Sequence, residues 1–209
     1  GKLGSHLAWT PEGLWIASPL LNDGAGAVLG LDGSQRDSTH RNTGIALTGT
    51  GGGAFAWATG WASLDGTEGR TEGRPTAIHM NDQGTMGVGM ARGPHYFASD
   101  NVQLSRIETG DEGGFSIASA DVDGDGKSEW IIGFPAKAIV VALNGDSYEV
   151  TKQWTGSGRF GHSIAVCSTP NSATSHFLIG APLLDEKGAV FVYENFKTEA
   201  AAIWSGRHS

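Results

Sequence analysis

A repeat runs through most of this chain and limits the folds that it can adopt. Residues 114–135 correspond to residues 161–182 when the sequence is shifted by 47 positions. Both copies contain Gly-x-Ser-Ile-Ala, followed further on by an apolar run that ends in Ile-Gly-x-Pro. A period of about 40–50 residues indicates that the fold is built from stacked copies of one supersecondary unit.

Two weaker copies lie earlier in the chain, at its start and near residues 85–98. The anchors at the end of the apolar run are Pro19, Ala91, Pro135 and Pro182, separated by steps of 72, 44 and 47 residues. The long first step contains the irregular stretch 32–75, which is rich in glycine and includes a doubled Thr-Glu-Gly-Arg. We expect this stretch to be an exposed insertion, cut first by trypsin after Arg70.

Composition favours many short strands and tight turns. Glycine accounts for 33 of 209 residues, more than twice its usual share of ~7%, and only 17% of the residues are charged. Each copy reads as four short strands, and apolar runs such as 130–133 fit a sheet that is covered on both faces. The predicted class is therefore all-β, a β-propeller with one four-stranded blade per copy.

One segment, Asp121–Glu129, carries the strongest sign of chemistry, and we call it the acidic loop. Carboxylates occupy its positions 1, 3, 5 and 9, and glycines occupy positions 4 and 6. An all-oxygen cage of this kind suits Ca²⁺ before Mg²⁺, although an acidic, solvated turn is the alternative. The expected ligands are the carboxylates of Asp121, Asp123, Asp125 and Glu129 and the backbone carbonyl of Lys127.

The acidic loop is not an EF-hand, because position 12 is Ile132 where that motif needs a bidentate glutamate. The flanking runs, 114–120 and 130–133, are short and glycine-bounded, and they predict strands rather than helices. We therefore expect a calcium loop inside a β-hairpin. The role of the ion should be structural, since a metal saturated by protein oxygens has no open position for catalysis.

Phe160-Gly161 followed by Gly180-Ala181-Pro182, with the acidic loop in the preceding copy, resembles the FG-GAP repeat. That repeat builds the seven-bladed propeller at the head of integrin α-subunits and the carboxy-terminal propeller of glycosylphosphatidylinositol-specific phospholipase D. The resemblance is strong over 113–193, fair over 3–31 and weak over 76–107. It implies about four blades in this chain, as part of a seven-bladed ring, and an extracellular or secreted location, with the cell surface included.

The expected layout is one partial propeller over residues 1–209, completed by further blades or a companion chain. Its segments are a blade at 3–31, the insertion at 32–75, a blade at 76–107, the calcium blade at 113–154, a blade at 159–193 and a tail at 194–209.

Other functional classes find less support. The net charge of −8 disfavours nucleic acids and anionic membranes as partners, and no apolar run is long enough for a membrane span. Gly161–Ala165 resembles a nucleophile elbow around Ser163, but the same pattern recurs at 114–118, which favours a structural role. We expect no catalytic and no cofactor-binding residue apart from the metal ligands. Trp57 and Trp61, beside the insertion, are expected to be exposed and available to a ligand.

Two functions remain open. The first is a non-catalytic, calcium-stabilised propeller of an extracellular protein that binds a protein or glycan for adhesion, recognition or scaffolding. The second is the propeller portion of a secreted glycosylphosphatidylinositol-specific phospholipase D, whose active site would lie outside this chain.

Overall fold

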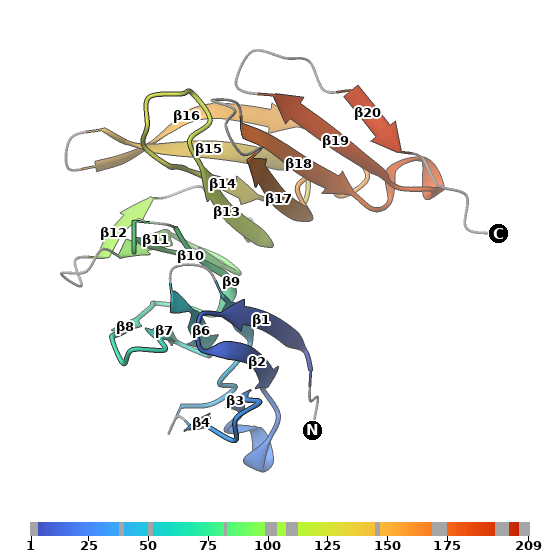
Figure 1. Ribbon diagram of the computed structural model, residues 1–209. Coiled ribbons are helices and arrows are strands. Elements are labelled where there is room, and N and C mark those ends of the chain that lie inside the picture. Colours follow the sequence, from blue (N-terminus) through green and yellow to red (C-terminus); the bar gives the residue numbers. More distant parts are fainter. Residues whose placement is uncertain are drawn as a thin grey trace. The chain divides into compact units, whose positions relative to one another are not determined.

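A computed structural model describes residues 4–37, 40–49, 52–81, 83–98, 104–107, 113–144, 147–168, 175–194 and 201–204. This part of the chain forms five antiparallel sheets of four strands each, and consecutive strands are always neighbours (Figure 1). The predicted all-β propeller class is confirmed, with five sheets where the repeat predicts about four blades. Within the described ranges, none of the helices is long and apolar enough to cross a membrane.

The chain divides into two compact units, Gly1–Asp111 and Glu112–Ser209. The first unit holds three sheets, which we call blades 1 to 3. Blade 1 comprises β1 (His6–Thr10), β2 (Gly13–Ser18), β3 (Ala27–Gly30) and β4 (Gln35–Asp37). Blade 2 comprises β5 (Ala46–Thr48), β6 (Ala54–Trp57), β7 (Gly60–Ser63) and β8 (Glu68–Arg70). Blade 3 comprises β9 (Pro75–Met80), β10 (Met86–Met90), β11 (His95–Ala98) and β12 (Leu104–Ile107).

The second unit holds blades 4 and 5. Blade 4 comprises β13 (Ser116–Ala120), β14 (Glu129–Gly133), β15 (Lys137–Asn144) and β16 (Ser147–Thr155). Blade 5 comprises β17 (Ser163–Ser168), β18 (Ser175–Ala181), β19 (Ala189–Glu194) and β20 (Ala201–Trp204). Two short 3-10 turns, Asn22–Gly24 and Leu184–Glu186, link the second and third strands of blades 1 and 5.

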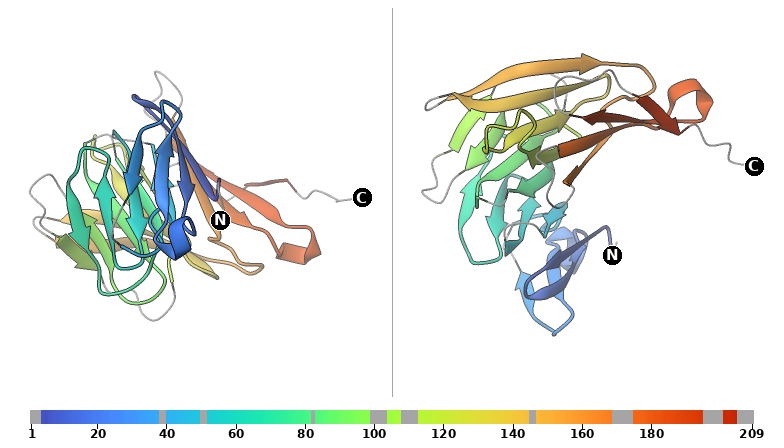
Figure 2. Two further views of the ribbon diagram at one scale, coloured as in Figure 1. Left: turned by 90° about the horizontal axis from the view of Figure 1, so that it is seen from below. Right: turned by 45° about the horizontal axis from the view of Figure 1, so that its top comes forward.

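Within each unit, the first strands of successive blades lie against one another. In the first unit β1 contacts β5 and β5 contacts β9, and in the second unit β13 contacts β17. The sheets of the first unit stack face to face, coloured blue to green in Figure 2. The first strand is therefore the inner strand of each blade and the fourth strand is the outer one, which is the arrangement of a propeller.

The hydrophobic core lies between neighbouring sheets. Trp15 and Val28 of blade 1 pack with Phe55 of blade 2, and a second cluster joins blades 2 and 3. In the second unit, Ile131 and Val140 of blade 4 pack against blade 5. The second strand of blade 4, β14, is buried on both faces, which explains why it reads as a continuous apolar run.

The prediction of an insertion at 32–75 is wrong, because this stretch contains β4 and all of blade 2. Its glycines make room for tryptophan rings rather than marking a flexible loop. A Cβ at Gly60 would lie 2.5 Å from the Trp57 ring, and a Cβ at Gly69 would lie 2.7 Å from the Trp61 ring. Both tryptophans are only 2% exposed, so the expected exposed pair is also wrong.

Two consequences follow for the predicted layout. Arg70 ends β8 and pairs with Gly60 of β7, so the premise for early trypsin cleavage there, a segment outside the blades, does not hold. The predicted tail, 194–209, contains β20, which pairs with β19 and completes blade 5. The other blade boundaries lie within a few residues of the predicted ones, apart from β4, which extends blade 1 beyond residue 31.

Candidate metal centre

The acidic loop connects β13 to β14, and these strands pair from Ser116↔Gly133 to Ala120↔Glu129. The predicted setting inside a β-hairpin is therefore confirmed. Gly124 and Gly126 turn the chain at φ values of +86° and +84°, in the left-handed region where glycine carries no Cβ penalty. Between the first two aspartates, Val122 is fully buried in the cluster that joins blades 4 and 5, and it anchors the loop to the core.

Backbone N–H groups of the loop donate to its carboxylates. Asp121 accepts from Gly124 (2.7 Å) and from Gly126 (2.9 Å). The Val122 N–H donates to Glu129 Oε2 at 2.9 Å, which ties the start of the loop to its end. These bonds hold the two carboxylates in place, because each is fixed by the fold of the loop itself.

Three of the predicted ligands converge. Oxygen atoms of Asp121, Asp123 and Glu129 all lie within 4.8 Å of one another. Glu129 is only 4% exposed, whereas Asp123 is exposed and Asp121 is half-buried. The group is thus a cluster of carboxylates with one side in the core and the other open to solvent.

The electrostatic environment of Glu129 is unfavourable for its charge. The pKa of the Glu129 carboxyl rises from its ordinary value of 4.5 to about 7. Burial is the largest cause; the hydrogen bond from Val122 lowers the pKa, and the negative charges of the three loop aspartates raise it. A cation at the carboxylate group would offset this repulsion.

The other two predicted ligands, Asp125 and the Lys127 carbonyl, are not among the three side chains that converge. Asp125 Oδ1 accepts from the Lys127 N–H at 2.8 Å, and the Lys127 ammonium lies 3.9 Å from Asp125 Oδ2. Both side chains are exposed. Their part in metal binding remains a prediction. Sequence reasoning did not single out Val122, although an apolar residue between two aspartates was a signal that one side of the loop faces the core.

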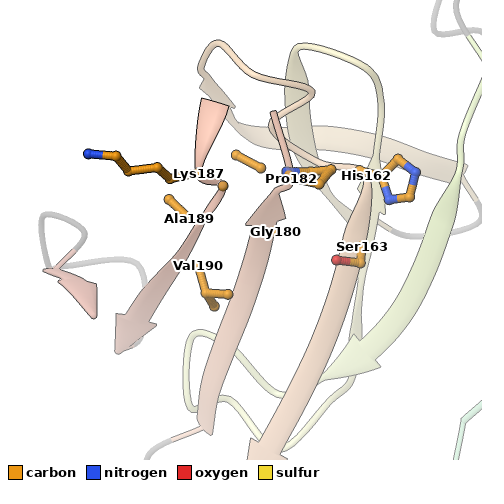
Figure 3. A pocket seen from close by; sticks show the side chains of 9 residues that line it. His162, Ser163, Gly180, Pro182, Lys187, Ala189 and Val190 are labelled. Atoms are coloured by element: carbon orange, nitrogen blue, oxygen red, sulfur yellow. The ribbon is translucent and has the colours of Figure 1, made fainter. Parts of the chain in front are cut away.

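Ser163, the residue of the possible nucleophile elbow, opens β17, and the chain continues as a strand to Ser168. A nucleophile elbow needs a helix after the serine, so this geometry does not match that motif. His162 and Ser163 instead line a pocket of about 260 Å³ at the edge of blade 5, together with Gly180, Pro182 and Ala189 (Figure 3).

Comparisons with known proteins agree with the fold. No protein-family profile and no curated protein sequence matches the chain. Among solved structures, the chain is similar to the Dos1 propeller, with 11% identity and a TM-score of 0.54, over 93% of this chain and 59% of that one. It is also similar to BBS1N in a complex with ARL6DN, with 14% identity and a TM-score of 0.48, over 92% of this chain and 53% of that one.

The chain thus spans between half and three-fifths of the length of these neighbours. At 11% identity, the likeness to the Dos1 propeller shows the fold alone. That likeness and the five four-stranded sheets identify the chain as a β-propeller, at least in part.

Proposed function

We propose that this chain is a non-catalytic binding or scaffold module, a β-propeller of the FG-GAP type that Ca²⁺ stabilises in an extracellular protein. The observation that carries the proposal is the convergence of Asp121, Asp123 and Glu129 within one hairpin. A propeller suits a binding role because its rigid sheets present many loops, which is where ligand contacts concentrate. The proposed partners are further propeller blades or a companion chain, with a protein or glycan as ligand.

The chemistry of the cluster favours a hard divalent cation. Its ligand atoms are carboxylate oxygens, which suit Ca²⁺ and Mg²⁺ rather than a soft metal. Ca²⁺ accepts six to eight oxygens in flexible geometry, so Asp125 and the Lys127 carbonyl complete the proposed ligand set. The ion would supply positive charge to Glu129, whose ionised form is disfavoured first by burial and then by the neighbouring aspartates.

The role of the ion in this proposal is structural. The acidic loop joins two strands of one blade, and Val122 beside it is packed in the core. An ion held here ties the hairpin ends together through Asp121 and Glu129. The alternative, the propeller portion of a glycosylphosphatidylinositol-specific phospholipase D, has no observation of its own within this chain, since its active site would lie elsewhere.

Calorimetric titration and thermal melting with and without a chelator test the proposal. Extracellular calcium modules bind at about 10⁻⁴–10⁻³ M, and an ion at ten times its dissociation constant stabilises the fold by about 1.4 kcal/mol. We expect chelation to lower the melting temperature by a few degrees and Asp123→Ala to abolish this response. Asp123→Asn should be milder, because an amide oxygen still ligates.

The matched control is Glu12→Ala, which removes an exposed acid from the turn between β1 and β2, the same hairpin of blade 1. This variant should keep the full response to chelator. A melting curve of the wild-type chain that ignores chelator, together with no heat of Ca²⁺ binding, would contradict the proposal.

A further inference from the structure

Three of the five blades begin with a glycine in the same conformation, which we call the leading glycine. These residues are Gly4, Gly44 and Gly161, at φ values of +78°, +86° and +94°. Each leading glycine donates its N–H to the second strand of its own blade. The acceptors are the carbonyl oxygens of Ala17, Ala56 and Gly180, at 3.1, 2.9 and 3.1 Å. The leading glycines are therefore equivalent positions of the repeat.

Gly161, the leading glycine of blade 5, docks onto blade 4. A Cβ at Gly161 would meet the backbone oxygens of Lys137 and Phe134 at less than 3.0 Å, so only glycine fits this contact. The Ser116 hydroxyl donates to the Gly161 carbonyl at 3.1 Å. Phe160, just before it, is 2% exposed and belongs to the core cluster between the two blades. Blade 4 thus carries a site for a leading glycine, which we call the receptor. It consists of Ser116, Gly133, Phe134 and Lys137.

The same contact recurs in the first unit. A Cβ at Gly44, the leading glycine of blade 2, would lie 3.0 Å from the Ala17 Cβ and 3.2 Å from the Ala27 oxygen of blade 1. Ala17 and Ala27 lie on β2 and β3, as Gly133 and Lys137 lie on β14 and β15. Docking of a leading glycine therefore occurs both between blades 1 and 2 and between blades 4 and 5.

The pocket on blade 5 occupies the position of this receptor. The receptor residues on β13 and β14 are matched to blade 5 by the shift of 47 residues. The position on β15 is matched through strand pairing, because Gly133 pairs with Ala138 in blade 4 and Gly180 pairs with Val190 in blade 5. The matching positions are Ser163, Gly180, Ala181 and Ala189, and all four line the pocket (Figure 3). At Gly133 the atom nearest to a Cβ belongs to Gly161 of the next blade, whereas at Gly180 the three nearest all belong to Ser163.

The sheet face around this pocket is apolar and open. On blade 4 the corresponding residues pack beneath blade 5 and are 0–6% exposed: Ala118, Ile131, Ala138 and Val140. On blade 5 their equivalents are exposed or half-buried: Ala165, Leu178, Val190 and Val192. Blade 5 thus presents the same kind of face that blade 4 uses to bind a blade, with its residues exposed or half-buried.

Blade 1 carries the complementary half of such an interface. No atom lies within 4 Å of a Cβ placed on its leading glycine, Gly4. Leu7 and Trp9 on β1 are 61% and 74% exposed. Their equivalents on blade 5, Ile164 and Val166, are half-buried against the cluster shared with blade 4.

We propose that a second copy of this chain docks on blade 5, head to tail. Gly4 of one copy seats in the pocket formed by Ser163, Gly180 and Ala189 of the other, and the Leu7–Trp9 face covers Ala165 and Leu178. The two surfaces differ, so the contact is heterologous and the pair keeps one free surface of each kind. The inference rests on the proposal that further blades complete this propeller, and it does not depend on calcium.

Light scattering over a range of concentrations tests the docking with variants at exposed sites, measured in chelator so that calcium plays no part. Wild-type chain should associate, and Trp9→Glu or Ala165→Glu should each weaken association at least tenfold. An equimolar mixture of the two variants should form a heterodimer and nothing larger, since the mixture contains one intact head and one intact tail. Val150→Glu changes another exposed apolar site, on β16, and is the control that should behave as wild type.

Cys167 gives a second readout, because it is exposed on the same face of β17 as Ala165. Association should slow its reaction with a thiol reagent at least tenfold, and Trp9→Glu should restore the rate. Monomeric wild-type chain with a reactive Cys167 would overturn the proposal. Monomeric chain with a protected Cys167 would overturn it too, since blade 1 would then cover blade 5 within one chain. Should one variant fail to melt cooperatively, the other still tests its own surface.

Discussion

Blades 3 and 4 solve the same hairpin in two ways. In blade 3, Asn81 follows β9 directly, and its side-chain oxygen accepts from the N–H groups of Gln83 (3.0 Å) and Thr85 (2.8 Å). In blade 4, Asp121 follows β13 directly and accepts two backbone N–H groups, one on each carboxylate oxygen. A single amide oxygen thus closes the turn of blade 3, whereas the longer loop of blade 4 uses both oxygens of a carboxylate.

The acids of blade 4 accept backbone N–H groups of the loop, and they also place several negative charges close together. Asp121 brings a charge that Asn81 lacks, and Asp123 and Glu129 place two further carboxylates beside it. Like charges this close destabilise the empty loop, unless a cation joins them or one of them takes a proton. Strand pairing and packing thus set the hairpin itself, and the acidic cluster adds repulsion between carboxylates to it.

The first of the two largest expected effects concerns the packing that supports the hairpin. Val122 is fully buried, and Val122→Ala should lower the free energy of unfolding by about 2–3 kcal/mol, from lost burial and the cavity left behind. The loss should be similar with and without Ca²⁺, because it comes from packing. Urea denaturation in both conditions measures it. A loss seen only with Ca²⁺ would mean that Val122 acts through the metal site instead.

The second is the pH dependence of stability that the acidic cluster causes. Its sign follows from the raised pKa of Glu129. In chelator, the folded chain holds a proton on Glu129 up to a pH of about 7, whereas the unfolded chain releases it near 4.5. Stability from this group is therefore full below pH 4.5 and is lost as the pH rises through 7. We expect a loss of roughly 3 kcal/mol across that window.

Glu129→Gln removes the titrating group while keeping an oxygen for the Val122 N–H. This variant should lack most of the loss between pH 4.5 and 7 in chelator, when unfolding free energies are compared at several pH values. An unchanged pH profile would show that Glu129 does not cause this loss of stability.

The smallest effect makes blade 4 resemble blade 3. Asp121→Asn keeps an oxygen for only one of the two backbone N–H groups, which bond separately to Oδ1 and Oδ2 of Asp121, and it removes one charge from the cluster. In chelator the two changes oppose each other, since one hydrogen bond is lost and one repulsive neighbour is gone, so stability should change by less than about 1 kcal/mol. In Ca²⁺ this variant should bind more weakly. Melting in both conditions tests both expectations, and a loss of more than about 2 kcal/mol in chelator would contradict the comparison.

Much of the architecture was readable in the sequence because it is encoded locally. Gly-x-Ser-Ile-Ala and the apolar runs after it mark β13, β14, β17 and β18, and the alternating acids mark the loop between the first two. Strand alternation, turn glycines and short spacings act within a few residues of one another. The FG-GAP type, the calcium ion and the extracellular setting stay predictions.

Only the tertiary structure decided the rest, because it depends on residues that meet across strands and blades. Blade 2 is not visible in the sequence, because its strands lack the repeat pattern. Its packing depends on Gly60 and Gly69, which leave room for the rings of Trp57 and Trp61. Burial of Glu129 likewise follows from packing around the loop, whereas Asp125 is exposed. The sequence by itself determined the strands of the recognisable copies and where carboxylates gather. Packing decided which of those carboxylates share a site and which sheet faces stay open, since both depend on neighbours distant along the chain.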